Sequence, residues 1–118
     1  MNNTEEKFRQ IILKNTGAYI KKMPDYKMMC SSGLRGLPDF LVIESGITRW
    51  YEVKDAKSNH TFNFNKIEDS QWIEFKKMYD AGAYIYFAVF FGKKFKVIDF
   101  EEIYNMKFEL HKDKYLYN

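Results

Sequence analysis

The chain has 118 residues, which is enough for one domain around a single hydrophobic core and too few for two, so we expect one domain over residues 1–118. Hydrophobic residues make up 46% of it and charged residues 30%, a balance that excludes a disordered chain and predicts a globular one. The formal net charge of +3 is a weak basic bias, which permits a nucleic-acid partner but does not by itself indicate one.

Several features of the composition exclude further classes of protein. Cys30 is the only cysteine, so an intramolecular disulfide is impossible, and a catalytic thiol lacks a recognisable histidine partner. His60 and His111 have no zinc-ligand spacing with Cys30 or with each other, so we interpret both as ordinary surface or loop residues. The apolar run 83–91 is too short to span a bilayer, and no apolar signal segment opens the chain. We therefore expect a cytoplasmic protein of a bacterium or a phage-infected host.

The first predicted element is an amphipathic helix over residues 3–15. Asn3 is its expected N-cap, with Glu6 at the third helical position as in a capping box, and Gly17 ends it. Its buried stripe consists of Phe8, Ile11 and Ile12. Glu5 lies on the same stripe, so it either interacts with the helix dipole as a first-turn acid or reaches into a site.

A short strand over residues 18–22 is expected next, and it ends before Pro24. Residues 24–36 then form a loop that contains two glycines, two serines and two basic residues. Such a loop allows the main chain to approach a phosphate, and a plain connector is an equally good interpretation.

Residues 39–54 predict a β-hairpin. Two short apolar runs flank the turn residues Ser45 and Gly46, a pattern typical of paired antiparallel strands. Pro38 stands just before the first run, where its missing N–H breaks no bond of the ladder.

The open end of this hairpin is expected to gather three charged side chains. Pairing about the turn brings Asp39 close to Glu52, and the alternation of side chains puts Lys54 on the same face as Glu52. Two neighbouring carboxylates repel each other, and a hard divalent cation such as Mg²⁺ relieves that repulsion. A lysine beside them can then face a phosphate or an attacking water. The alternative is a surface hairpin with charged ends.

The chain continues with a polar segment and a second helix. Residues 55–66 are rich in polar side chains and predict a mobile segment that could clamp a nucleic-acid strand. Residues 68–81 predict a helix that ends at Gly82. Its buried face consists of Trp72, Phe75 and Tyr79. Gln71, in the first turn, is either an exposed polar residue or part of a site.

Two strands and a short helix complete the pattern. The strands are expected over residues 83–91 and 95–98, and the helix over residues 99–105 with Asp99 as its N-cap. The tail 106–118 is a solvated tail, a dimer arm or a DNA contact. The order of helix, strands, helix, strands and helix predicts an α/β fold with a mixed central β-sheet flanked by helices.

The hairpin carries two short motifs, Pro38-Asp39 at its start and Glu52-Val53-Lys54 at its end. Together they resemble the signature of the PD-(D/E)xK nuclease superfamily, and the wider resemblance covers residues 5–98. It implies a restriction-endonuclease-like fold with the element order αβββαββα, and a metal-dependent hydrolase of phosphodiester bonds.

Two branches of that superfamily show the nearest resemblance. Residues 32–39 with Gln71 resemble the small phage-type VRR-NUC nucleases, and residues 52–57 with 61–62 and Gln71 resemble the RecU-type Holliday junction resolvases. This resemblance implies a Mg²⁺-dependent endodeoxyribonuclease, with Mn²⁺ as a substitute, that cuts four-way junctions in DNA recombination and repair. Two symmetric cuts in one junction imply a homodimer. A restriction-like or flap-cutting nuclease and a non-cleaving DNA-binding module are the alternatives.

The resemblance also implies roles for individual residues. The implied metal ligands are Asp39, Glu52, the Val53 carbonyl and, directly or through water, Glu5. Glu6 is the alternative acid of the first helix. Lys54 would orient the attacking water or stabilise charge on the phosphate, and Gln71 would lie near the metal site. The DNA contacts that we expect are Lys27, Arg35, Lys57 and Lys66.

Overall fold

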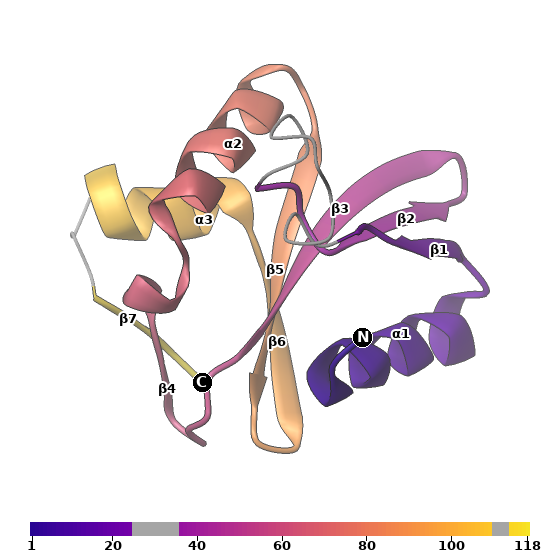
Figure 1. Cartoon of the computed structure of the whole chain (residues 1–118), viewed down its shortest axis with the longest axis horizontal. Coiled ribbons are helices and arrows are strands. Elements are labelled where there is room, and N and C mark those ends of the chain that lie inside the picture. Colours follow the sequence, from indigo (N-terminus) through magenta and orange to yellow (C-terminus); the bar gives the residue numbers. More distant parts are fainter. Residues whose placement is uncertain (25–35, 110–113) are drawn as a thin grey trace.

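In a computed structural model of the chain, residues 1–24, 36–109 and 114–118 are described. They form a central β-sheet with helix α1 on one face and helices α2 and α3 on the other (Figure 1). The elements in chain order are α1 (Asn3–Thr16), β1 (Tyr19–Lys22), β2 (Phe40–Glu44), β3 (Ile47–Asp55), β4 (Thr61–Asn63), the 3₁₀ helix η3 (Phe64–Lys66), α2 (Asp69–Asp80), β5 (Tyr84–Phe91), β6 (Lys94–Asp99), α3 (Phe100–Tyr104), the π-helix η4 (Asn105–Glu109) and β7 (Tyr115–Tyr117). The predicted α/β fold with a mixed central sheet is therefore confirmed.

The central sheet has the strand order β1-β2-β3-β5-β6 within the described part of the chain. Strands β3 and β5 are parallel, and the other neighbouring pairs are antiparallel. A parallel pair needs a crossover connection, and here β4, η3 and α2 supply it. Strand β3 thus lies in the middle of the sheet, and its carboxyl end runs past the beginning of β2.

The β2–β3 hairpin has the turn that its sequence predicts. Ser45 and Gly46 both have positive φ angles, of 52° and 78°, as a tight two-residue hairpin turn requires. This turn sets the register, in which Phe40 lies opposite Tyr51. One step further along the same register, Asp39, which precedes Phe40, lies beside Glu52, which follows Tyr51.

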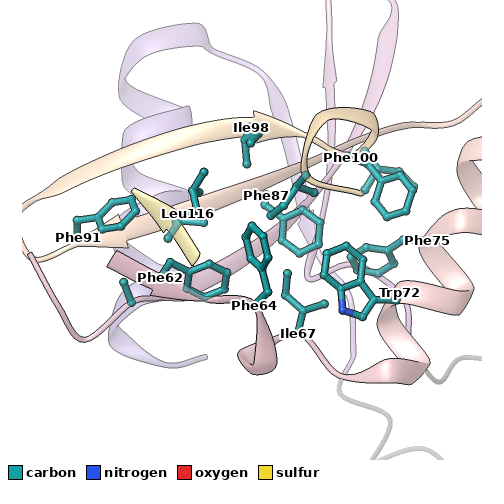
Figure 2. Close-up of a cluster of buried hydrophobic side chains, with 14 residues drawn as sticks. Phe62, Phe64, Ile67, Trp72, Phe75, Phe87, Phe91, Ile98, Phe100 and Leu116 are labelled. Carbon is teal, nitrogen blue, oxygen red and sulfur yellow. The ribbon is translucent and has the colours of Figure 1, made fainter. Parts of the chain in front are cut away.

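Each face of the sheet has its own hydrophobic core. Phe8 of α1 is fully buried against Phe40, with ring centroids 5.2 Å apart, and Val53 lies in the same cluster. The larger cluster on the other face is rich in aromatic rings (Figure 2). Its labelled members are Phe62, Phe64, Ile67, Trp72, Phe75, Phe87, Phe91, Ile98, Phe100 and Leu116. Because Val53 belongs to the α1 face, its neighbours in β3 point toward the α2 face.

The polar segment and the tail differ from the sequence prediction. Residues 55–66 were expected to be mobile, but Phe62 and Phe64 within them are buried in the larger core. Burial of two phenylalanines contributes about 3–6 kcal/mol, which outweighs the polar character of their neighbours. Strand β4 also pairs with β7, where Leu116 is buried. The end of the tail is therefore a strand of a second, two-stranded sheet, not a solvated tail.

The first helix begins at Asn3 as predicted, but its N-cap lies one residue earlier than expected. Asn2, not Asn3, is the N-cap, because its side chain accepts a hydrogen bond from the N–H of Glu5. The capping box therefore uses Glu5 and not Glu6. The predicted end at Gly17, with φ +64°, and the predicted cap of α3 at Asp99 are both confirmed.

Some expectations concern residues outside the described ranges or surface positions. Cys30, His111 and most of the loop 24–36 lie outside the described residues. His60 is exposed in the β3–β4 connection, as expected for a surface residue. Among the described residues, helices long and apolar enough to cross a membrane are absent.

Candidate functional site

Asp39 and Glu52 are held together by the main chain of the hairpin. The N–H of Asp39 donates to Glu52 Oε1 over 3.1 Å, and the N–H of Val53 donates to Asp39 Oδ2 over 2.9 Å. Each carboxylate is thus fixed by a main-chain donor of the other strand. The short turn brings the two acids together because it leaves no freedom in the register.

A lysine and a glutamine complete a cluster around Glu52 on the α2 face of the sheet. Lys54 Nζ lies 3.2 Å from Glu52 Oε2, and Gln71 Nε2 donates to the same oxygen over 2.7 Å. Lys54 Nζ also donates to Gln71 Oε1 over 3.0 Å. The three side chains form a closed triangle, which limits the rotamers of each member.

Gln71 is placed in this triangle by the start of α2. Its Oε1 also accepts a hydrogen bond from the N–H of Glu68, the N-cap residue, over 3.1 Å. The amide therefore closes the helix end and contacts Glu52 and Lys54 with one side chain. Of the two interpretations of Gln71, the structure supports the one in which its side chain is part of the candidate site.

Glu5 reaches the same region from the other face of the sheet. It is buried, with 8% of its surface exposed, and its Oε1 accepts a hydrogen bond from the N–H of Asn2 over 3.0 Å. Glu6 instead accepts a hydrogen bond from Gln10 and forms an ion pair with Arg9. Between the two acids of the first helix, Glu5 is thus the one beside the site.

Lys22 lies between the Glu5 and Asp39 carboxylates, and sequence analysis missed it. Its Nζ is 3.7 Å from Glu5 Oε2 and 3.9 Å from Asp39 Oδ1, and it donates to the Met23 carbonyl over 2.7 Å. A lysine at the end of a short strand is common, and no motif marks this one. Only the register of β1, in which Lys22 lies opposite Phe40, brings it to the site.

The acids of the site are electrostatically strained. Burial, and then the charge of Glu52, raise the pKa of Asp39 from 3.8 to about 8. Burial also raises the pKa of Glu52, although the ammonium of Lys54 opposes this effect. Both carboxyl groups therefore favour a proton or another positive charge in their immediate surroundings.

The donor set fits a hard divalent cation that keeps several of its own waters. The described residues contain no group of three His, Cys, Asp or Glu side chains that could hold a metal ion. Asp39 and Glu52 are nevertheless adjacent, and the Val53 carbonyl faces the same strand edge as its N–H, which bonds to Asp39. Two carboxylates, a carbonyl and water are donors that Mg²⁺ accepts. Glu5 is separated from Asp39 by Lys22, so a water-mediated role suits it better than a direct one.

A small cavity of about 110 Å³ adjoins these residues. Its walls include Lys22, Gly36, Asp39 and Gln71. Gly36 has a φ of +87°, and a Cβ there would lie 3.2 Å from the Ser70 carbonyl, so a larger residue would strain this wall. Of the acids, Asp39 is accessible through this cavity, whereas Glu52 and Glu5 are buried and are not among its walls.

The expected DNA contacts occupy different environments. Lys57 is exposed beyond the end of β3, with its N–H bonded to Asp55 Oδ1. Lys66 Nζ donates to the Ala56 carbonyl over 2.8 Å and to the Asp55 carbonyl over 3.3 Å, so its ammonium fastens η3 to the end of β3. Lys27 and Arg35 lie outside the described residues.

Comparison with known proteins supports the fold and leaves the family open. No protein-family model matches the chain, and no curated protein matches its sequence. Among solved structures, Hjc of Archaeoglobus fulgidus, a Holliday junction resolvase from an archaeal hyperthermophile, is similar with a TM-score of 0.60. The match covers 81% of this chain and 74% of that one at 14% sequence identity. The chain therefore shares the mixed α/β, restriction-endonuclease-like fold of this resolvase.

Proposed function

We propose that the protein is a divalent-metal-dependent endonuclease that hydrolyses phosphodiester bonds of DNA. One arrangement carries this proposal. The carboxylates of Asp39 and Glu52 accept hydrogen bonds from the main-chain N–H groups of Val53 and Asp39, and the ammonium of Lys54 lies 3.2 Å from Glu52. Two adjacent acids with raised pKa values, one half-buried and one buried, are costly for stability, and a site that uses them is a physical reason for their presence.

Asp39, Glu52 and the Val53 carbonyl are the groups that we expect to hold the cation. When bound, Mg²⁺ would supply positive charge that polarises the scissile phosphate and favours attack by water. Mn²⁺ should substitute because it accepts the same oxygen donors. Glu5 would act in the outer part of the site through its contact with Lys22.

Lys54 is the residue that we expect to act on the reacting atoms. In hydrolysis the water oxygen bonds to phosphorus and the bond to one ester oxygen breaks, so negative charge develops on the phosphate oxygens. An ammonium already positioned there stabilises that charge or orients the water without reorganisation. The hydrogen bond from Lys54 to Gln71 holds the ammonium in place.

A four-way DNA junction is the substrate that we propose. The similar Hjc structure belongs to a Holliday junction resolvase, and the basic residues of this chain are mostly lysines, which suit phosphate contacts and recognition of shape. Two cuts in one junction need two sites, so we propose a homodimer. Exposed apolar side chains on one face of β5 and β6, namely Tyr84, Phe95 and Val97, offer surface for such an interface.

The test is a cleavage assay on four-way junctions, flaps and linear duplexes with Mg²⁺, Mn²⁺ or EDTA. We expect paired nicks across the junction, cut faster than linear duplex, and no cutting in EDTA. Equal cutting of linear duplex at a defined sequence would indicate a restriction-like nuclease. Binding of DNA without cutting of any substrate would indicate a non-cleaving DNA-binding module.

A further inference from the structure

A basic surface lies beyond the end of β3, outside the candidate site. It is a groove of about 700 Å³ between the first turns of α1, the β3–β4 connection and the β5–β6 turn. The residues that line it include Lys7, Asn59, His60, Lys93 and Lys94. We propose that this groove binds the phosphodiester backbone of the DNA next to the point of cleavage. This proposal rests on the proposed function and adds the path of the DNA next to the candidate site.

The lysines of the groove have charges available to a ligand. Lys7, Lys93 and Lys94 are exposed, and within the described part of the chain none of them forms an ion pair with a carboxylate. Lys54 and Lys76 differ in this respect. Lys54 is paired with Glu52, and Lys76 Nζ lies 2.7 Å from a carboxylate of its own helix.

Asp55, the one acidic side chain in the wall of the groove, already has partners. Asp55 Oδ1 accepts a hydrogen bond from the N–H of Lys57 over 2.8 Å, and Asp55 Oδ2 accepts one from the Thr4 hydroxyl over 3.3 Å. A second groove of about 600 Å³ continues from the first along α1, shares Lys7 and Lys93 with it and has Glu6 in its wall. The positive charge of the first groove comes from three lysines on two separate elements, α1 and the β5–β6 turn, so it is not confined to a single point.

The groove is held in shape by contacts between its walls. The Asn118 N–H donates to the His60 carbonyl over 2.9 Å, and Asn118 Nδ2 donates to the Asn59 carbonyl over 3.0 Å. Gly92 has a φ of +62°, and a side chain there would collide with Asn59 Oδ1. The β5–β6 turn can therefore pack closely against the β3–β4 connection. A surface that is ordered before binding loses less conformational entropy when a ligand arrives.

The position of the groove relative to the candidate site suits one continuous strand. Helix α1 carries Glu5 at the site and Lys7 in the groove, and its first turn lies near the β5–β6 turn (Figure 1). Strand β3 likewise carries Lys54 at the site and, one residue later on the opposite face of the strand, Asp55 in the wall of the groove. A DNA backbone with one phosphate at the site would therefore reach the groove around the end of β3. A lysine ammonium is a point charge and lacks the planar set of donors of an arginine, so it suits phosphate oxygens better than the edges of bases.

The test compares two triple variants that each lose three positive charges. One is Lys7→Gln, Lys93→Gln, Lys94→Gln, and the matched control is Lys14→Gln, Lys77→Gln, Lys107→Gln, which alters other surfaces. Both are made in the Asp39→Asn protein, and their affinity for a labelled four-way junction is measured by fluorescence anisotropy from about 50 to 200 mM salt. For the groove variant we expect affinity to fall at least about tenfold. The negative slope of log K against log salt should become shallower by about 0.9 for each phosphate contact removed. The control should lose less than about threefold.

A second measurement locates the DNA directly. In lysine acetylation of the complex, Lys7, Lys93 and Lys94 should be protected, whereas Lys14 and Lys77 should stay reactive. If both triple variants weaken binding equally, or if the groove lysines stay reactive in the complex, the groove proposal is wrong while the proposed function stands. If the Asp39→Asn protein with all its lysines binds no DNA, both proposals fail.

Discussion

The amide of Gln71 in α2 and the carboxylate of Glu52 in β3 are joined by a hydrogen bond of 2.7 Å across 19 residues of sequence. The same amide accepts a hydrogen bond from Lys54 Nζ. Gln71 therefore connects the acid and the ammonium of the candidate site, and it ties their positions to the start of a helix.

Replacement of Gln71 by alanine should destabilise the protein and reduce cleavage. Glu52 is 4% exposed and would keep Lys54 and the Asp39 N–H but lose its hydrogen bond from Gln71, and a hydrogen bond to a charged group contributes about 1.5–3 kcal/mol. Urea denaturation measures the first effect and single-turnover cleavage the second. Gln10→Ala is the control, since Gln10 bonds to Glu6 on the surface of α1. Equal stability of both variants would contradict a structural role of the Gln71–Glu52 bond.

Asp39→Asn should change the pH dependence of stability in EDTA. The pKa of the Asp39 carboxyl is raised from 3.8 to about 8 by burial and by Glu52. Between about pH 4 and pH 8 the folded chain keeps a proton that the unfolded chain has released, so the free energy of unfolding falls as pH rises. This contribution is fully present below about pH 4 and is lost as pH rises through about 8.

The amide that Asp39→Asn introduces cannot ionise, so the variant should become more stable than the wild type toward about pH 8 and lose that advantage toward about pH 4. Urea denaturation at several pH values measures the difference. Asp80→Asn, at an exposed ion pair, is the control. A constant difference between the Asp39→Asn protein and the wild type across this range would contradict the raised pKa of Asp39.

Lys54→Ala, Asp39→Asn and Glu52→Gln should each abolish cutting while DNA binding is largely kept. Removal of one preorganised group that stabilises developing charge costs about 10²–10³ in rate, so Lys54→Ala should lose at least that factor. Gel assays of cleavage and anisotropy measurements of binding separate the two steps. Lys77→Ala, an exposed lysine of α2, should cut at the wild-type rate. Full activity of the wild type in EDTA would rule out a metal-dependent site.

Lys22→Met should tighten the binding of Mg²⁺ and lower the stability of the metal-free protein. The Lys22 ammonium lies 3.9 Å from Asp39 Oδ1 and competes with any cation for that carboxylate. At this separation a unit charge in water contributes about 1 kcal/mol, so affinity should rise about fivefold. Calorimetric titration with Mg²⁺ and thermal unfolding in EDTA measure both effects. Lys21→Met, at the neighbouring exposed position of β1, is the control. A weaker affinity in Lys22→Met would show that Lys22 supports the cation instead of competing with it.

Val97→Asp should weaken a homodimer if the face of β5 and β6 is the interface. Val97 is 46% exposed on the same sheet face as Phe95, beside the region that α1 covers. A buried carboxylate in an apolar interface is strongly unfavourable. Sedimentation at micromolar concentration should show a dimer for the wild type and for Ile73→Asp, a control on exposed α2 surface, and a monomer for Val97→Asp. A wild type that stays monomeric with and without DNA would contradict dimer formation.

The parts of the site that depend on local rules could be predicted from the sequence. The positive-φ turn at Ser45 and Gly46 sets the hairpin register, so the proximity of Asp39 and Glu52 follows from turn geometry alone. The alternation of side chains likewise predicts that Lys54 shares the face of Glu52. The end of α1 at Gly17 depends on one residue that tolerates a left-handed conformation.

Other features depended on contacts between distant segments, which no local pattern encodes. Lys22 reaches Asp39 only because β1 pairs with β2 in one register, and short strands have little local preference for a register. The burial of Phe62 and the pairing of β4 with β7 depend on a core assembled from both halves of the chain.

The sequence by itself thus determined the hairpin and the pair of acids at its open end, because a two-residue turn and side-chain alternation act over a few residues. Only the tertiary structure decided between the two interpretations of Gln71, added Lys22 to the cluster and placed Lys7 opposite the β5–β6 turn across a groove. Those relationships arise when helices pack on a sheet, and the free energy that selects them comes from the burial of the two hydrophobic cores.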